Sequence, residues 1–113
     1  MAIYSNLTVD QGSNFQADID VTDADGDVLN LAGYTVAGQI RKSYNSTTAT
    51  DFVGAVQNAA GGVVRITLTA IATNAMKAGR YVYDVEITKT ATSEVTRIVE
   101  GQLEVRPGVT RAS

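Results

Sequence analysis

The segment Gly79-Arg80-Tyr81-Val82-Tyr83-Asp84-Val85-Glu86-Ile87-Thr88 decides the fold of this chain. Large apolar side chains alternate with mostly polar ones along its whole length. One face carries Tyr81, Tyr83, Val85 and Ile87, and the other carries Val82, Asp84, Glu86 and Thr88. This period of two is typical of an antiparallel strand with one buried and one solvated face. The segment therefore predicts an all-β fold with its tyrosines in the core.

Shorter segments of the same kind occur along the rest of the chain, separated by turn residues. We expect strands at residues 5–9, 15–22, 28–31, 34–42, 52–57, 63–69 and 95–105, in addition to 79–88. Residues 70–77 break the period of two. They fit a helical turn, capped by Thr69, that packs Ile71, Ala75 and Met76 on one end of the core. The spacing predicts an immunoglobulin-like antiparallel β-sandwich of seven or eight strands, and a small closed barrel is the alternative.

The long strand is expected to form a hairpin with residues 95–105. The expected partners are Ile87 with Val95, Val85 with Arg97, Tyr83 with Val99 and Tyr81 with Gly101. Sliding this pairing by two residues would set Asp84 opposite Glu100, and opposed like charges destabilise a sheet. The expected pairing places Arg97 on the apolar face, from which its long side chain would extend to solvent at the end of the sandwich. The alternative is a bulge near Thr96 that turns Ile98 inward.

Length and composition limit the classes of function. At 113 residues the chain is expected to be a single domain, with residues 1–6 and 106–113 as arms or tails. The net charge of −3 argues against a nucleic-acid surface, which needs a basic patch. No apolar run approaches the roughly 18 residues of a membrane-spanning helix. The chain has no Cys and no His, so it lacks thiol chemistry, the usual general base and the commonest metal ligand. We therefore expect no enzyme activity, no catalytic residues, no cofactor, and neither nucleic-acid nor membrane partners.

Charge is distributed unevenly along the sequence. The first forty residues contain six aspartates and no Lys or Arg, whereas residues 41–113 contain all nine basic residues and six acidic ones. Regions of opposite charge on a small protein favour head-to-tail contacts with copies of itself or with neighbouring proteins. The alternative interpretation is that both regions are ordinary solvated faces.

The aspartates at 23, 25 and 27 are the candidate cation site. A D-x-D-G-D turn offers several carboxylates, and Ca²⁺ prefers six to eight oxygen ligands. The spacing does not complete an EF-hand loop, because Gly26 comes too early and no glutamate closes the loop. Asp23, Asp25 and Asp27 are therefore weak Ca²⁺ candidates, and a plain hairpin turn is the favoured interpretation.

Partner contacts are expected on the loop at residues 42–51 and on the tail at 106–113, because long loops often carry contacts. The candidate partner-binding residues are Tyr44, Asn45, Arg106, Val109 and Arg111. A carbohydrate platform built from Tyr4, Tyr34 and Tyr44 is a further possibility, although Tyr34 fits the core better.

Several motifs together resemble a group of small bacteriophage proteins. They are Gln11-Gly12-Ser13-Asn14-Phe15, Asp23-Ala24-Asp25-Gly26, Leu31-Ala32-Gly33-Tyr34, Gln39-Ile40-Arg41, residues 78–86, Glu100-Gly101-Gln102-Leu103 and Pro107-Gly108-Val109-Thr110. The chain resembles small virion structural proteins of tailed bacteriophages that have an immunoglobulin-like domain. It is similar to the N-terminal domain of phage baseplate upper proteins, which attaches receptor-binding parts to the tail.

The resemblance implies a non-enzymatic structural protein of the virion. Its role would be docking or adaptation in the tail, baseplate or fibre-attachment region. Its partners would be other virion proteins or copies of itself, in an oligomeric arrangement within the particle. A capsid or neck decoration protein is one alternative, and a carbohydrate- or Ca²⁺-binding host-attachment module is another.

Overall fold

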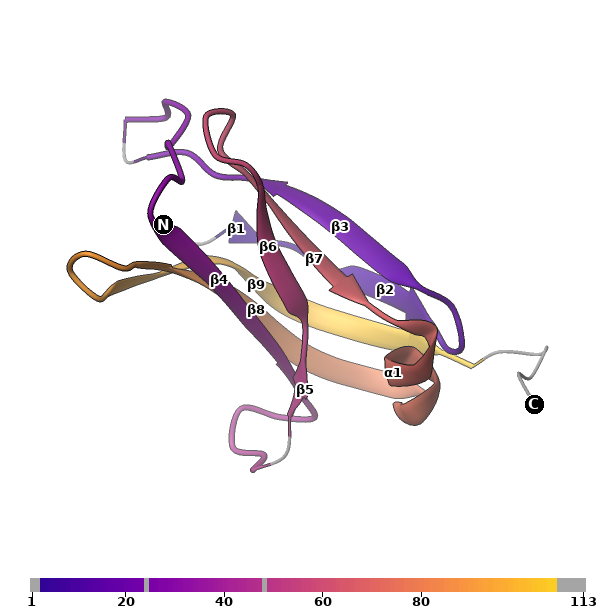
Figure 1. The fold of residues 1–113 in the computed structure, drawn as a ribbon. Helices are drawn as coiled ribbons and strands as arrows, with labels where there is room; N and C mark the ends of the chain where they lie inside the picture. The colour runs from indigo at the N-terminus through magenta and orange to yellow at the C-terminus, as the bar shows by residue number, and fades with distance from the viewer. Residues whose placement is uncertain (1–2, 24, 48, 108–113) are drawn as a thin grey trace.

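The computed structural model describes residues 3–23, 25–47 and 49–107, which form two β-sheets packed face to face (Figure 1). The larger sheet has the order β1-β9-β8-β4-β5, with β2 also paired to β9, and the smaller sheet has the order β3-β7-β6. The larger sheet contains β1 (Ile3–Tyr4), β2 (Leu7–Asp10), β4 (Tyr34–Arg41), β5 (Thr50–Asp51), β8 (Gly79–Lys89) and β9 (Glu94–Arg106). The smaller sheet contains β3 (Phe15–Asp20), β6 (Val53–Asn58) and β7 (Val63–Leu68), and the helix α1 covers Ala70–Ala75. The expected immunoglobulin-like all-β sandwich is confirmed, although the described residues form nine strands where seven or eight were expected.

The core lies between the two sheets and is built by the alternation seen in the sequence. On β8, Tyr83, Val85 and Ile87 are buried, as the opening segment predicted. On β7, Val64, Ile66 and Leu68 face them from the smaller sheet. Phe52 connects the layers, because its ring lies 6.2 Å from that of Phe15 and 6.1 Å from that of Tyr83.

The expected register of β8 on β9 is wrong, by two residues over Gly79–Val85 and by one residue over Glu86–Lys89. Tyr83 lies opposite Gly101, and Asp84 lies opposite Glu100. The register shifts next to Val85 because β9 contains a bulge at Ile98, and this turns the Ile98 side chain into the core. The bulge, which was the less favoured alternative, is therefore the correct interpretation.

Arg97 offsets the repulsion between Asp84 and Glu100 in this register. Its Nε lies 3.3 Å from Asp84 Oδ2, and its Nη1 lies 3.8 Å from Glu100 Oε1. One cation thus compensates the two opposed carboxylates, so the like charges no longer forbid the pairing.

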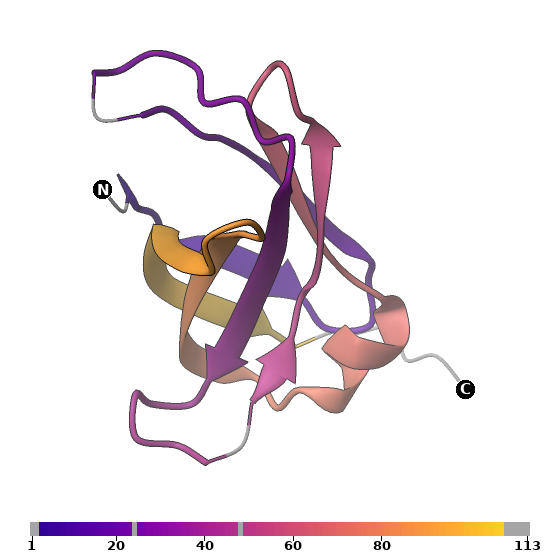
Figure 2. The same cartoon turned by 60° about the vertical axis from the view of Figure 1, so that its left-hand side comes forward.

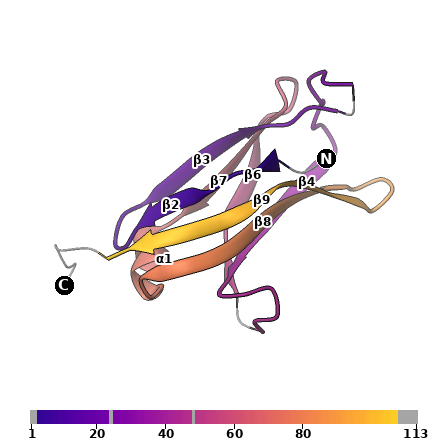
Figure 3. The same ribbon diagram turned by 180° about the vertical axis from the view of Figure 1, so that it is seen from behind.

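The N-terminal segment pairs with β9 in parallel, which the sequence did not predict (Figure 3). The expected strand at residues 5–9 is found as β2, and Ile3 and Tyr4, which were expected in an arm, form β1 in the same sheet. The Ser5 N–H donates to the Glu100 carbonyl over 2.8 Å, and the Tyr83 hydroxyl donates to the Ser5 carbonyl over 2.6 Å. A Cβ at Gly101 would lie 2.1 Å from the Ser5 oxygen, so the strand needs glycine there.

Two further expectations need correction. Residues 28–31 form no strand, because the structure has a single bridge there, between Thr22 and Val28. In α1, Thr69 is the N-cap as predicted, but Ile71 is 84% exposed. Ala75 is exposed as well, so of the three residues expected to pack on the core only Met76 is buried, and Thr73 is buried in addition. Ile71 lies two residues before Thr73, about 200° around the helix, and therefore points away from the core.

Candidate functional site

The outward face of the larger sheet carries a shallow groove of about 320 Å³, which we call the sheet-face groove. Its side chains come from β4, β8, β9 and the loop after β4. The groove is lined by Gln39, Arg41, Tyr44, Asp84, Glu86, Arg97 and Glu100, together with Val82 and Tyr83. A second hollow of about 500 Å³ shares Gln39, Asp84 and Glu86 with the groove and extends it to Asp51. The polar side of the opening segment therefore becomes the floor of a continuous surface.

The loop end of the groove is fixed by hydrogen bonds around Arg41. Its Nη1 donates to the Ser46 carbonyl over 2.6 Å, and its Nη2 donates to Gln39 Oε1 over 2.8 Å. The Gln39 amide in turn donates to Asp51 Oδ1 over 2.9 Å. These hydrogen bonds hold the middle and the end of the 42–51 loop against β4.

The opposite side of the groove is held by Arg97, which lies between Asp84 and Glu100 as described above. Both guanidinium groups of the groove therefore already have partners in the chain. Glu86 differs from the other acids: within the described residues its carboxylate has neither a hydrogen bond nor an ion pair. It is half-buried and lines both hollows.

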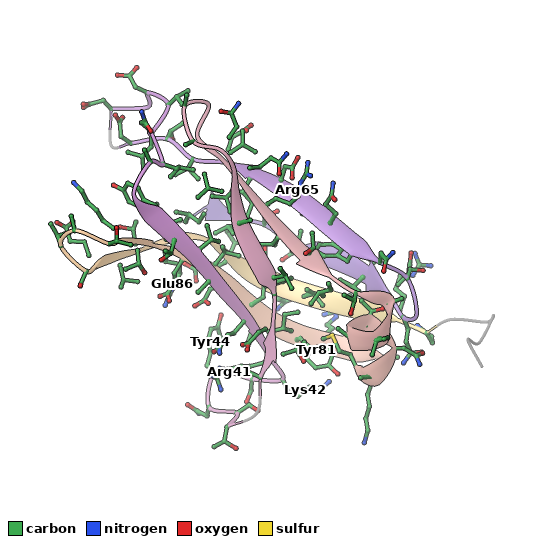
Figure 4. The ribbon with its side chains drawn as sticks, viewed as in Figure 1. Arg41, Lys42, Tyr44, Arg65, Tyr81 and Glu86 are labelled. Atoms are coloured by element: carbon green, nitrogen blue, oxygen red, sulfur yellow. The ribbon has the colours of Figure 1, made fainter. Side chains whose placement is uncertain are left out.

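Tyr44 stands beside the groove with 75% of its surface exposed (Figure 4). Its loop projects from the end of β4, at the opposite end of the molecule from the aspartate-rich turn (Figure 2). Tyr4 is also exposed, but β9 and β8 separate its strand from β4. Tyr34 packs against the core. The three tyrosines therefore do not form one carbohydrate platform.

Of the other predicted partner-binding residues, the structure describes Asn45 and Arg106. Asn45 is exposed next to Tyr44 on the loop. Arg106 is exposed at the end of β9, where it lies opposite Asp10 of β2. Val109 and Arg111 lie outside the described residues.

The aspartate-rich segment is a turn held by one carboxylate. Asp23 Oδ1 accepts hydrogen bonds from the amides of Asp25, over 2.9 Å, and Asp27, over 3.0 Å. Gly26 takes a φ of +85°, which glycine adopts without strain. Across the described residues, no three acidic side chains lie close enough together to hold a metal ion. The hairpin-turn interpretation therefore accounts for this segment.

Two other charged contacts lie outside the groove. Arg65 Nε donates to Asp18 Oδ1 over 2.8 Å, between β7 and β3. This hydrogen bond lowers the pKa of Asp18 below its usual value and raises that of Arg65. Lys42 Nζ lies 4.8 Å from the centre of the Tyr81 ring, a cation–π contact at the end of β4.

Sequence reasoning identified Tyr44 but missed the rest of the groove. The missed residues are Gln39, Arg41, Asp84, Glu86, Arg97 and Glu100. The alternation of polar and apolar residues indicated the polar face of each strand, and this was the only signal in the sequence for the groove residues. Which polar faces become neighbours depends on the strand order β9-β8-β4 and on the bulge, and neither is encoded locally.

In the described part of the chain, no helix is long and apolar enough to cross a membrane. No protein-family model matches this chain, and no curated protein sequence does so either. Among solved structures, Listeria monocytogenes InlP is similar at 16% identity and a TM-score of 0.49, covering 93% of this chain and 28% of InlP. A family 123 glycoside hydrolase from Clostridium perfringens is similar at 14% identity and a TM-score of 0.42, covering 94% of this chain and 23% of the hydrolase. The chain spans less than a third of the length of either protein.

Proposed function

We propose that this chain is a non-enzymatic structural protein of a tailed-bacteriophage virion. It acts as a docking or adaptor module in the tail, baseplate or fibre-attachment region. The observation that best supports a docking role is the sheet-face groove, a continuous polar surface whose side chains are held by hydrogen bonds and ion pairs. The resemblance of the turn and core motifs to small phage virion proteins supports the virion setting.

The composition of the groove supports binding and not catalysis. None of the residues that line it is Ser, Thr, Cys, His or Lys, so it lacks a Ser, Thr or Cys nucleophile and a His or Lys base, and two of its three carboxylates are paired with Arg97. Tyrosine and arginine, which are enriched at protein interfaces, are both present. Arranged charges such as Asp84, Arg97 and Glu100 fix the register of a partner and exclude partners of the wrong charge pattern.

The scaffold holds its N-terminal strands in the same sheet as the groove. β1 and β2 hold the start of the described chain against β9, so the N-terminal and C-terminal strands lie side by side (Figure 3). The groove lies on the opposite side of the same sheet from the core. A partner can therefore dock there without disturbing the buried residues.

The proposal is tested on purified phage particles. Particles are separated into heads and tails, and the protein is identified in each fraction by mass spectrometry and with an antibody. We expect it in the tail fraction, in a fixed copy number per particle. Detection in heads alone would favour a capsid decoration protein and overturn the tail assignment. Absence from purified particles would overturn the virion role altogether.

A further inference from the structure

We propose that the sheet-face groove seats a cationic side chain, arginine or lysine, carried by an extended segment of the docking partner. The Glu86 carboxylate and the Tyr44 ring would hold this cation. The inference rests on the proposed docking function and deepens it by giving the partner's chemistry.

The charge of the surface gives the first argument. The groove and the adjoining hollow are lined by four carboxylates, from Asp51, Asp84, Glu86 and Glu100, and by two guanidinium groups, from Arg41 and Arg97. Arg97 is shared between two of the acids, and Arg41 donates to a carbonyl and an amide oxygen. The surface therefore has excess negative charge, and its own cations do not compensate for it. Electrostatic complementarity favours a positively charged partner.

Glu86 indicates where in the groove the partner's cation would bind. Its carboxylate is half-buried, lines both hollows, and has no hydrogen bond or ion pair within the described residues. A carboxylate that has lost part of its hydration gains more from an incoming cation than a fully exposed one does. The seat for the cation therefore lies at the overlap of the two hollows.

Tyr44 gives the second contact. An exposed ring at the rim of an acidic groove attracts a cation through its electron-rich face. The chain already uses this contact once, where Lys42 Nζ lies 4.8 Å from the centre of the Tyr81 ring. Arg41 donates to the Ser46 carbonyl and to Gln39 Oε1, so its guanidinium is already engaged beside the site where Glu86 would receive the cation.

The experiment uses the isotope-labelled full chain and a short blocked peptide of alternating glycine and arginine as the probe. The control peptide carries citrulline, which has the shape of arginine without its charge. We expect the arginine peptide to shift backbone amide signals of β4, β8 and β9 around the groove, with little effect from the citrulline peptide. Equal shifts with both peptides, or shifts confined to the β3-β7-β6 sheet, would overturn the proposal.

Matched variants locate the seat. Glu86→Gln should weaken binding of the arginine peptide about fivefold, as expected for the loss of one ion pair worth about 1 kcal/mol. Asp20→Asn changes the net charge by the same amount on the other sheet and should leave binding unchanged. Tyr44→Ala should weaken binding, and Tyr44→Phe, which keeps the ring, should not. Equal losses of affinity in Glu86→Gln and Asp20→Asn would show that the peptide responds only to net charge, and would refute a cation site at Glu86. These results are independent of particle fractionation, so this inference and the virion role can fail separately.

Discussion

At the scale of single residues, Tyr83 connects the core to the N-terminal segment. Its ring is buried against Phe52, and its hydroxyl donates to the Ser5 carbonyl over 2.6 Å. Burial raises the pKa of the Tyr83 hydroxyl above its ordinary value, although the hydrogen bond to Ser5 opposes this shift. Tyr83 therefore has a packing role and a polar role, which two substitutions can separate.

Tyr83→Phe should lower the free energy of unfolding by about 1 kcal/mol, because it removes one hydrogen bond and leaves the Ser5 carbonyl without its donor. Tyr83→Ala should cost about 3–5 kcal/mol, because it also leaves a cavity. Urea unfolding followed by circular dichroism measures both. A loss below about 1 kcal/mol for Tyr83→Ala would contradict the buried position of the ring.

Gly101→Ala should destabilise the chain by about 1–3 kcal/mol, the usual cost of overpacking. The reason is the 2.1 Å approach between an added Cβ and the Ser5 carbonyl oxygen, which is backbone and cannot rotate away. Gln102→Ala is the control, since its side chain is exposed on the same strand. Hydrogen exchange should become faster across β2 in Gly101→Ala alone. Unchanged exchange there would mean that the segment tolerates the methyl group.

At the scale of secondary-structure elements, the β8–β9 register depends on Arg97. Arg97→Met should cost about 0.5–1 kcal/mol at low salt, because Asp84 and Glu100 then oppose each other without compensation. Arg97 is half-exposed, so the loss should shrink as salt is added. Adding Asp84→Asn to Arg97→Met should restore part of the stability, which a double-mutant cycle measures. Simple additivity of the two substitutions would disprove the coupling.

The β3–β7 pair predicts a dependence on pH. The hydrogen bond from Arg65 lowers the pKa of Asp18, so the folded state favours its ionised form. The stability from this contact is complete above the unfolded-state pKa of about 3.9 and is lost as pH falls through the lower folded-state pKa. Arg65→Gln should return the Asp18 pKa towards its ordinary value, as measured by NMR titration. An unchanged Asp18 pKa in Arg65→Gln would contradict this contact.

At the scale of the whole molecule, the fold is closed by its first described residues. Leu7 lies opposite Leu103 and Val9 opposite Val105, so β2 contacts β9 across nearly the whole chain. Val9 is buried, and Leu7 packs against the core. The N-terminal segment is therefore part of the domain core.

Removing residues 1–10 should cost about 3–6 kcal/mol, since two apolar side chains at about 1.5–3 kcal/mol each lose their burial. That is a large fraction of the roughly 5–15 kcal/mol that stabilises an ordinary domain. Thermal unfolding followed by circular dichroism measures the loss. A synthetic peptide of residues 1–11 should restore stability in a concentration-dependent way. Unchanged stability in the shortened chain would contradict the closure.

The sequence by itself determined the features that depend on near neighbours. The period of two assigned the faces of β8 correctly, and the aspartates with Gly26 specified a turn because their side chains and backbone bond within five residues. Thr69 was identified as the helix cap for the same reason. These interactions are local, so their residue pattern predicts them.

Only the tertiary structure decided the register of β9, the parallel pairing of β1 and β2, and the sheet-face groove. With the bulge at Ile98, Arg97 forms ion pairs with both Asp84 and Glu100. These three residues lie on two strands, so the pattern of one strand does not predict their contact. The parallel pairing needs Gly101, Ser5 and the Tyr83 hydroxyl to meet from distant parts of the chain. The groove exists because β4, β8 and β9 become neighbours, and among the described residues no side chain pairs with Glu86 there. Long-range packing sets these features, and a local period of two is compatible with several such arrangements.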